Sequence, residues 1–300
     1  MTIQTVALIG AGNMGSRMAW CLHQAKYKLI VCDQNTAILD EFSQQGCQVT
    51  QKASDCARAD LVIVMVADDD QVLAVTAGAE GVIAGLDGQH HPLVCIMSTA
   101  LPETIQRIGQ LLGAQGVGVV DAPVSGGLVK AAQGTLTIMM SGCSSDIDRI
   151  EPVMKAMGTD LFRCGELGAA EVVKVINNML GIANIYLAAE AFQLATRYGV
   201  NLQQLIPILE VSSGRNFMTQ DATLTAEQYQ AWARSPEAFM SLKNIVSKDL
   251  HLAQELATRK GLKLELLDDV SARVDATTPE VMHTWNDVAS NLSQTTEKGN

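Results

Sequence analysis

The chain has 300 residues, of which 48% are hydrophobic and 18% are charged, and its formal net charge at pH 7 is −11. This composition excludes an intrinsically disordered protein, and the length favours two domains that each bury a core. The negative charge argues against nucleic acid or an anionic membrane as a partner, because both are polyanions. An anionic substrate would have to be held by local cations or backbone N–H groups.

The first half of the chain alternates short β-branched runs with stretches of helical length. The predicted strands are 5–9, 28–32, 61–66, 93–97, 117–121 and 135–140. This alternation indicates βαβ units and a parallel sheet, and because the runs are almost wholly apolar, helices should cover both faces of the sheet. The sequence therefore predicts an α/β, doubly wound Rossmann domain over residues 1–164.

A glycine-rich segment follows the first predicted strand and precedes a helical pattern at 16–24. It reads Gly10, Ala11, Gly12, Asn13, Met14, Gly15. In this context the first glycine permits a tight turn, the second lets the backbone approach a pyrophosphate, and the third lets helix and strand pack closely. A glycine-rich turn without a ligand is the alternative. The context favours dinucleotide binding by these six residues.

An acidic residue, Asp33, ends the second predicted strand, about twenty positions after Gly10 as the dinucleotide motif requires. Its carboxylate can accept hydrogen bonds from the adenosine ribose hydroxyls. The extra phosphate of NADP would be repelled there, and Gln34 and Asn35 follow where an arginine would be needed. NAD is therefore the predicted cofactor, and an N-cap role for Asp33 is the alternative.

The second half of the chain has helical periodicity and no β-branched runs. One proline-free helix is predicted over 168–198, closed by a left-handed cap at Gly199 and followed by a new N-cap at Asn201. A helix of roughly thirty residues can connect two domains and line the cleft between them. We therefore predict an all-α domain over residues 165–300, joined to the first by this helix.

The cysteines and histidines predict neither a disulfide framework nor a metal site. The seven cysteines contain no Cys-x-x-Cys pair, and the five histidines lack metal-binding spacing. The longest unbroken apolar stretch, 61–67, is too short to span a bilayer, and no basic segment precedes the first strand. The expected location is the cytoplasm, with free thiols.

Further segments show a resemblance to a known family. The segments are Ser98-Thr99, 121–127 (Asp-Ala-Pro-Val-Ser-Gly-Gly), 165–178, 212–215 (Ser-Ser-Gly-Arg) and 248–250 (Lys-Asp-Leu). With the glycine loop they span most of the chain, and the sequence resembles the β-hydroxyacid dehydrogenases, the group that includes 3-hydroxyisobutyrate dehydrogenase. Two departures stand out: Ala170 replaces the third spaced glycine before Lys174, and the usual proline near Val66 is absent.

The resemblance implies roles for residues that also have ordinary structural interpretations. Ser125, Gly126 and Gly127 would bind the substrate carboxylate as an anion nest, although a glycine turn explains them equally well alone. Lys174 would be the catalytic acid/base, although a lysine among valines usually reaches solvent. Asn178, four residues later on the same helix face, would hold substrate.

The resemblance also implies cofactor contacts outside the glycine loop. Thr99 would contribute a hydroxyl, unless it caps the helix expected near Pro102. Lys248 would reach the cofactor, unless it is an ordinary exposed helix residue. Val66 and Ala67 would contact the adenosine side.

The sequence therefore predicts an NAD-dependent dehydrogenase that interconverts a small 3-hydroxy carboxylic acid and its carbonyl form. Family resemblance further implies a homodimer or homotetramer built through the helical domain. The alternatives are a non-catalytic dinucleotide-binding module, an imine reductase, a reductase for a substrate such as tartronate semialdehyde, and an enzyme for a phosphorylated sugar acid. The presence of Lys174 argues against the first two. Arg215 is the one evident cation for the phosphorylated acid.

Overall fold

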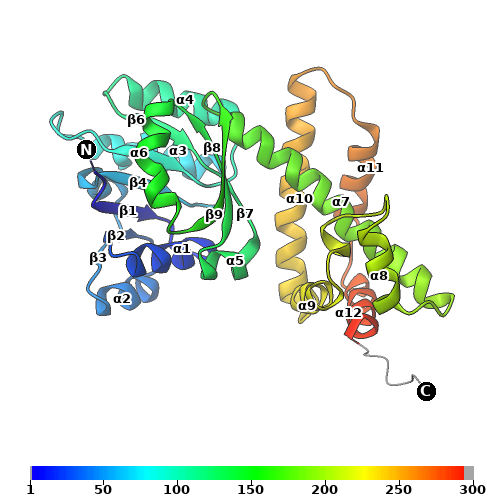
Figure 1. Ribbon diagram of the computed structural model, residues 1–300. Helices are drawn as coiled ribbons and strands as arrows, with labels where there is room; N and C mark the ends of the chain where they lie inside the picture. The colour runs from blue at the N-terminus through cyan, green and yellow to red at the C-terminus, as the bar shows by residue number, and fades with distance from the viewer. Residues whose placement is uncertain (1, 294–300) are drawn as a thin grey trace. The chain divides into compact units, whose positions relative to one another are not determined.

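A computed structural model describes residues 2–293 as two compact units, the first ending at Lys174 and the second beginning at Val175 (Figure 1). The predicted fold class is confirmed: an α/β unit precedes an all-α unit. One long helix, α7 (Ala169–Arg197), begins in the first unit and continues in the second. The domain boundary predicted after residue 164 stays a prediction.

The first unit is built on a single sheet whose strand order is β3-β2-β1-β4-β5-β6-β8-β7, with β9 paired to β8. The strands are β1 (Thr5–Ile9), β2 (Lys28–Cys32), β3 (Gln48–Thr50), β4 (Leu61–Val64), β5 (Leu93–Ile96), β6 (Gly118–Asp121), β7 (Val124–Ser125), β8 (Leu136–Gly142) and β9 (Gly158–Gly165). Strands β1 to β6 are all parallel in the 3-2-1-4-5-6 order of dinucleotide-binding sheets.

The predicted parallel sheet is confirmed for β1 to β6, whereas β8 runs antiparallel to both β6 and β7. The chain leaves β6, forms the two-residue strand β7 and turns back through a short helix, so β8 returns in the opposite direction. A helical crossover then leads to β9, which pairs parallel to β8. Strands β3, β7 and β9 were not predicted.

Helices cover both faces of this sheet. They are α1 (Asn13–Gln24), α2 (Thr36–Gln44), α3 (Asp69–Ala77), α4 (Pro102–Gly113), α5 (Gly127–Gln133) and α6 (Ser144–Met154), with 3-10 turns at η1 (Ala53–Arg58) and η2 (Val82–Gly85). Successive strand residues alternate between the faces: Leu61 and Ile63 join one core, while Val62 and Val64 join the other.

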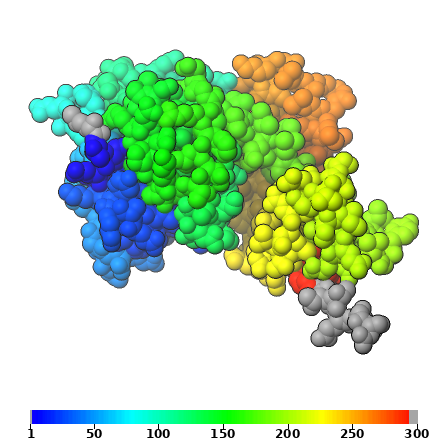
Figure 2. Space-filling model, in the orientation of Figure 1, coloured from blue at the N-terminus to red at the C-terminus, as the bar shows by residue number. Residues whose placement is uncertain are grey.

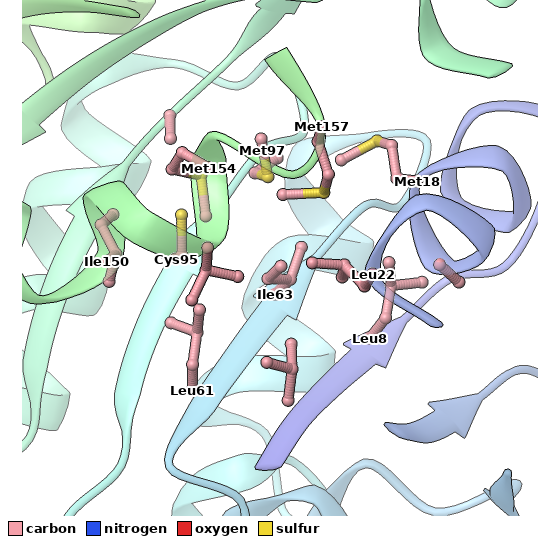
Figure 3. Packing of buried hydrophobic residues seen from close by; sticks show 14 of the residues in the cluster. Leu8, Met18, Leu22, Leu61, Ile63, Cys95, Met97, Ile150, Met154 and Met157 are labelled. Carbon is pink, nitrogen blue, oxygen red and sulfur yellow. The ribbon is translucent and has the colours of Figure 1, made fainter. Parts of the chain in front are cut away.

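The two cores of the first unit are contributed by different helices. One contains Met18 and Leu22 of α1 together with Ile150 of α6 (Figure 3), and the other contains Ile105 and Ile108 of α4. Both faces of each central strand are therefore removed from water. This burial explains why the strand sequences are continuous apolar runs and not alternating ones.

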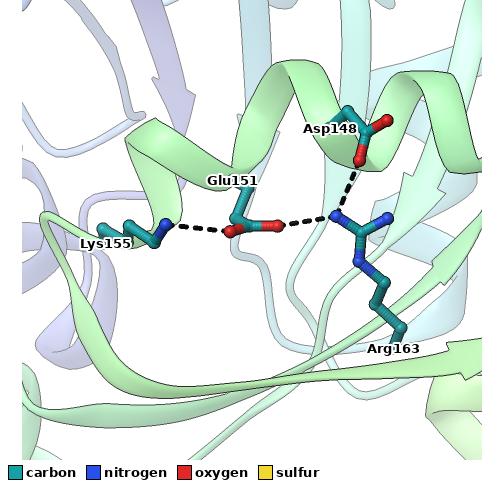
Figure 4. Close-up of polar contacts among 4 residues, drawn as sticks. All are labelled: Asp148, Glu151, Lys155 and Arg163. Carbon is teal, nitrogen blue, oxygen red and sulfur yellow. Dashed lines mark hydrogen bonds and ion pairs between the residues drawn. The ribbon is translucent and has the colours of Figure 1, made fainter.

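Helix α6 and the outer strand β9 are joined at the surface by ion pairs (Figure 4). Arg163 of β9 contacts Asp148 at 2.7 Å and Glu151 at 2.6 Å, and Lys155 contacts the other Glu151 oxygen at 2.9 Å. The residues of this region (green in Figure 2) form part of the outer surface of the unit. Exposed pairs of this kind contribute little stability singly, about 0–1 kcal/mol each.

The second unit packs its helices around an aromatic cluster. Its elements after α7 are α8 (Leu202–Glu210), η3 (Phe217–Thr219), α9 (Ala222–Trp232), α10 (Pro236–Arg259), α11 (Glu265–Asp275) and α12 (Glu280–Ser293). The ring of Trp285 on α12 lies 5.1 to 6.0 Å, between centroids, from those of Tyr186, Tyr229, Trp232 and Phe239. Trp285 is the largest fully buried side chain in the described chain.

Helix α7 matches its predicted bounds to within a residue, and Gly199 takes the expected left-handed φ of 72°. Asn201 caps α8 by accepting the Gln203 N–H at 2.8 Å. By length and composition alone, α7 is the one helix among residues 2–293 that is apolar enough to cross a membrane. A single such helix is weak evidence for a membrane span, because core helices of soluble proteins have the same length and composition.

We expect Trp285→Ala to destabilise the helical unit by about 3–5 kcal/mol, because it leaves a cavity that four rings cannot fill. Urea unfolding followed by far-UV circular dichroism measures the change. Tyr198→Ala is the matched control, since that side chain is 81% exposed and its loss should change stability by less than about 0.5 kcal/mol. Equal effects of the two substitutions would contradict a core organised on Trp285.

Candidate active site

The residues predicted to contact the cofactor follow four neighbouring parallel strands. Because β1, β2, β4 and β5 run parallel, their carboxyl ends lie along one edge of the sheet. The glycine loop follows β1, Asp33 follows β2, Val66 and Ala67 follow β4, and Thr99 follows β5. The topology therefore gathers residues that are far apart in the sequence, and ligands of such sheets bind at this edge.

The glycine loop is shaped by close backbone contacts. Gly10 has φ 91°, and a Cβ there would lie 2.2 Å from the Met65 carbonyl oxygen; a Cβ at Gly15 would lie 1.9 Å from the Gly10 carbonyl oxygen. A Cβ at Gly12, in contrast, would meet nothing within 4 Å. Gly12 is the N-cap of α1 and makes no side-chain cap, so no capping side chain occupies the first N–H groups of the helix. This cradle suits a pyrophosphate.

Asp33 is bound to the glycine loop. One carboxylate oxygen accepts the Ala11 N–H at 2.7 Å, and the other accepts the Asn35 N–H at 2.8 Å. The alternative role as a helix N-cap was wrong, because Asn35 caps α2 by accepting the Ala37 N–H at 3.0 Å. The carboxylate thus stands beside the phosphate cradle, at the carboxyl end of β2.

The next two loops along the edge are joined by a hydroxyl. The Val66 N–H donates to Ser98 Oγ at 2.7 Å, and the Ala67 N–H donates to the Gln71 side chain at 3.2 Å. Thr99, directly after Ser98, is half-buried and does not cap α4, whose N-cap is Leu101. The alternative interpretation of Thr99 as a cap was therefore wrong.

The predicted anion loop lies between β7 and α5. Ser125 ends β7, and Gly126 and Gly127 have φ of 132° and 68°, which residues with a Cβ rarely adopt. All three are at least partly exposed, and nothing lies within 4 Å of a Cβ built at Gly127. The loop therefore presents accessible backbone and one hydroxyl.

Asp121, whose hydrogen bonds were not predicted from the sequence, connects this loop to α7. The fully buried Asp121, at the end of β6, accepts hydrogen bonds from the Ser141 hydroxyl, the Gly168 N–H at 2.9 Å and the Glu171 N–H at 3.3 Å. Ala170, the departure from the family's glycine pattern, is buried and donates its N–H to Ser141 at 3.0 Å. Asp121 thus caps the N-terminus of α7, and burial raises its pKa.

Lys174 lies one turn farther along α7 and is only 9% exposed. The expectation that an unremarkable lysine would extend to solvent does not hold here. Val172 and Val173, its neighbours in sequence, are the exposed residues of this turn. The ammonium-bearing chain of Lys174 is therefore held in the protein, at the end of the first unit.

In the second unit, Asn178 and Lys248 are joined through an acid that sequence analysis did not single out. The Asn178 side-chain amide donates to Asp249 Oδ2 at 2.7 Å, and Lys248 Nζ lies 3.4 Å from Asp249 Oδ1. Asp249 is buried and fixes the amide orientation of Asn178. Within residues 2–293, no group of three or more His, Cys, Asp or Glu side chains is arranged to hold a metal ion.

Comparisons with known proteins identify the family. Residues 5–166 match the family model of the NAD binding domain of 6-phosphogluconate dehydrogenase. Residues 168–291 match the family model described as NAD-binding of NADP-dependent 3-hydroxyisobutyrate dehydrogenase. A 3-hydroxyisobutyrate dehydrogenase of Pseudomonas aeruginosa is 34% identical over 71% of each chain. The chain belongs to the 3-hydroxyisobutyrate dehydrogenase family.

Other members of this family differ in substrate. An NAD-dependent L-serine dehydrogenase of Pseudomonas aeruginosa is 33% identical over 85% of this chain and 86% of its own length, and an L-threonate dehydrogenase of Cupriavidus necator is 33% identical over 73% of each chain. A solved Mycobacterium tuberculosis 3-hydroxyisobutyrate dehydrogenase with L-serine has a TM-score of 0.79 at 25% identity, over 98% of this chain and all of that one.

As a 3-hydroxyisobutyrate dehydrogenase family member, the protein is an NAD-dependent hydroxyacid dehydrogenase that acts on a CH–OH group of a small molecule. The predicted enzyme class and cofactor are thereby confirmed. Imine reductases also share the fold, as in the Streptomyces aurantiacus enzyme, with a TM-score of 0.59. At 15% identity that likeness concerns the fold alone.

We expect Gly15→Ala to cost about 1–3 kcal/mol of stability and to weaken NADH binding, since its Cβ cannot fit against the Gly10 carbonyl without moving the loop. Thermal unfolding and NADH fluorescence titration measure the two effects. Gly113→Ala, at the end of α4 with open space around the new Cβ, is the control and should change neither. Unaltered NADH binding in Gly15→Ala would contradict the cradle.

Proposed function

We propose that the protein interconverts a small 3-hydroxy carboxylic acid, such as 3-hydroxyisobutyrate, and its carbonyl form, with Lys174 as the general acid/base. The observation that carries the proposal is the nearly buried Lys174 on α7, whose N-terminus is capped by the acid that ends β6. The same strand end leads into the glycine loop at Ser125. The hydrogen bonds of Asp121 thus support both the turn of α7 that carries Lys174 and the loop that contains Ser125.

In this proposal the cofactor is bound along the carboxyl edge of the sheet. Asp33 receives the adenosine ribose, and the N-terminus of α1 receives the pyrophosphate. The proposed cofactor residues are Gly10, Ala11, Gly12, Asn13, Met14, Gly15, Asp33, Val66, Ala67, Thr99 and, in the second unit, Lys248. These residues would hold the cofactor, whose nicotinamide would supply the hydride acceptor for oxidation and the hydride donor for reduction.

The substrate carboxylate is proposed to bind the Ser125 hydroxyl and the backbone N–H groups of Gly126 and Gly127. A chain with a net charge of −11 repels an anionic substrate at long range. The backbone N–H dipoles of this loop would attract the substrate carboxylate locally. Asn178, oriented by Asp249, is proposed to hold the same substrate. Fixing the carboxylate orients the hydroxyl-bearing carbon for hydride transfer.

Lys174 is proposed to accept the substrate hydroxyl proton at Nζ as the carbonyl forms, and to donate it in the reverse reaction. Its low exposure limits competition from water for that proton. The named substrates of the relatives fit this scheme, because 3-hydroxyisobutyrate, L-serine and L-threonate each carry a hydroxyl on the third carbon of a carboxylic acid. This shared chemistry favours the dehydrogenase over an imine reductase or a non-catalytic module.

We expect turnover with NAD in a spectrophotometric screen of 3-hydroxyisobutyrate, L-serine, threonate, glycerate and 3-hydroxypropionate, with NADP and tartronate semialdehyde as comparisons. Lys174→Ala should retain NADH binding and lose about 10²–10⁴-fold in kcat, the usual contribution of general acid–base catalysis. Lys155→Ala, which removes an exposed lysine directly after α6, is the control and should keep parental turnover.

Either of two results would overturn the proposal. Absence of turnover with all these acids would remove the substrate class. Turnover retained by Lys174→Ala would remove Lys174 from the mechanism, whatever the substrate.

We also propose a homodimer or homotetramer that assembles through α7. Val173, Leu180, Leu187 and Leu194 recur every seven residues on this helix and are 40%, 57%, 66% and 61% exposed. Apolar residues at heptad spacing form a stripe that packs against another helix. A second copy of α7 would cover this stripe, and the stripe also accounts for the apolar composition of the helix.

Leu187→Glu should shift the protein toward monomer in sedimentation-velocity experiments, because it places a charge in the middle of the α7 stripe. Val211→Glu is the control: Val211 is 86% exposed, lies outside α7, and should leave the assembly unchanged. A monomeric parent protein would contradict the proposed assembly outright.

A cytoplasmic location is proposed on the state of the thiols. All seven cysteines are free, and four of them are buried. Unpaired thiols of this number fit a reducing compartment.

A further inference from the structure

Glu171 is a buried acid in the first turn of α7 that has no role in the proposed reaction. Its side chain is 0% exposed. One carboxyl oxygen, Oε2, accepts the Ala100 N–H at 3.1 Å, while the other, Oε1, is buried and has no hydrogen-bond partner in the described chain. Burying an ionised carboxylate whose oxygen lacks a hydrogen-bond partner costs free energy. The charged groups near Glu171 therefore decide how readily it ionises.

The charged groups around Glu171 come from three elements. Asp121 on β6 and Asp69 at the start of α3 oppose its ionisation, and Lys174 on α7 favours it. Burial, the strongest influence, raises the pKa of Glu171 well above its ordinary value; the Ala100 N–H lowers it, Asp121 raises it, Lys174 lowers it and Asp69 raises it. The ionisation of Glu171 is therefore coupled to the charges of these three groups.

Glu171 and Lys174 are three residues apart on one helix, a spacing that places side chains on the same face. When Glu171 is ionised it stabilises the protonated form of Lys174, and when it is neutral this stabilisation is lost. The Ala100 N–H that Glu171 accepts belongs to the residue after Thr99, in the loop proposed to meet the cofactor. The side chain thus connects the loop after β5 to the turn of α7 that carries Lys174.

We propose that Glu171 is a positioning residue for Lys174, which ties the α7 turn to the loop after β5 and whose carboxyl sets how strongly Lys174 holds its proton. The inference rests on the proposed function, because Lys174 is the acid/base only in that proposal. The electrostatic coupling between the two side chains is, however, measurable without any substrate.

The test compares Glu171→Gln with Glu166→Gln. Glutamine at 171 keeps an oxygen to accept the Ala100 N–H and removes the charge. Glu166 is exposed and stands just before α7, so its substitution removes the same charge without touching the buried group. In each protein the acylation of Lys174 by acetic anhydride is followed from pH 6 to 11 by peptide mass spectrometry, which reports the pH at which Lys174 is half deprotonated.

We expect the half-deprotonation pH of Lys174 to fall by about one unit or more in Glu171→Gln and to stay unchanged in Glu166→Gln. The acidic limb of the kcat/KM profile for hydroxyacid oxidation should move to lower pH by the same amount, because the reaction requires neutral Lys174. An unchanged half-deprotonation pH in a folded Glu171→Gln protein would overturn the inference, since a merely structural role would not move it.

The labelling and the kinetics separate the two proposals. A shifted Lys174 titration in a parent protein that turns over no hydroxyacid would retain the coupling and reject the proposed function. If Glu171→Gln does not fold, Glu171→Asp serves instead: it keeps an acid but shortens its reach, and the half-deprotonation pH of Lys174 should again fall. No change in that variant would overturn the inference equally.

Discussion

The hydrogen bonds of Asp121 connect the parts of the candidate site that lie in the first unit. This buried carboxylate ends β6, accepts donors from β8 and from the first turn of α7, and so fixes where the long helix begins. Each residue of an α-helix advances the side-chain direction by about 100°, so a helix that began one residue later would turn Lys174 away from its present surroundings. The segment that leads to Ser125 also begins at the end of β6, so Asp121 fixes the start of both this loop and α7.

Nearby groups, and not the net charge of the chain, determine the electrostatics of the candidate site. The chain carries a net charge of −11, and its buried acid Glu171 interacts electrostatically with both Asp121 and Lys174, the lysine proposed for catalysis. Burial raises the pKa of both acids. In the proposed site, backbone N–H groups of glycine turns and helix ends would supply the positive potential that attracts an anion.

Local pattern predicted the buried strands well: β1 and β2 have their predicted bounds, because both faces of each strand are apolar. Strand β9 was missed because it lies at the outer side of the sheet and carries exposed polar residues such as Asp160 and Arg163. The reversed direction of β8 has no signature in its own residues. In the site, glycines and Asp33 were predicted from spacing, whereas the Asp121 to Gly168 and Asn178 to Asp249 bonds join residues 47 and 71 positions apart, which spacing does not reveal.

The contact between Gly15 and Gly10 limits how this sequence can change over generations. Every codon change that replaces glycine introduces a Cβ, and at either position that atom would overlap a main-chain oxygen. A replacement at either position is therefore expected to cost stability even in a protein that no longer binds its substrate but must still fold. Gly12 faces open space and is free of that restriction. A related sequence in which Gly12 is replaced while Gly10 and Gly15 are kept would therefore be expected to retain the fold and to have lost nucleotide binding.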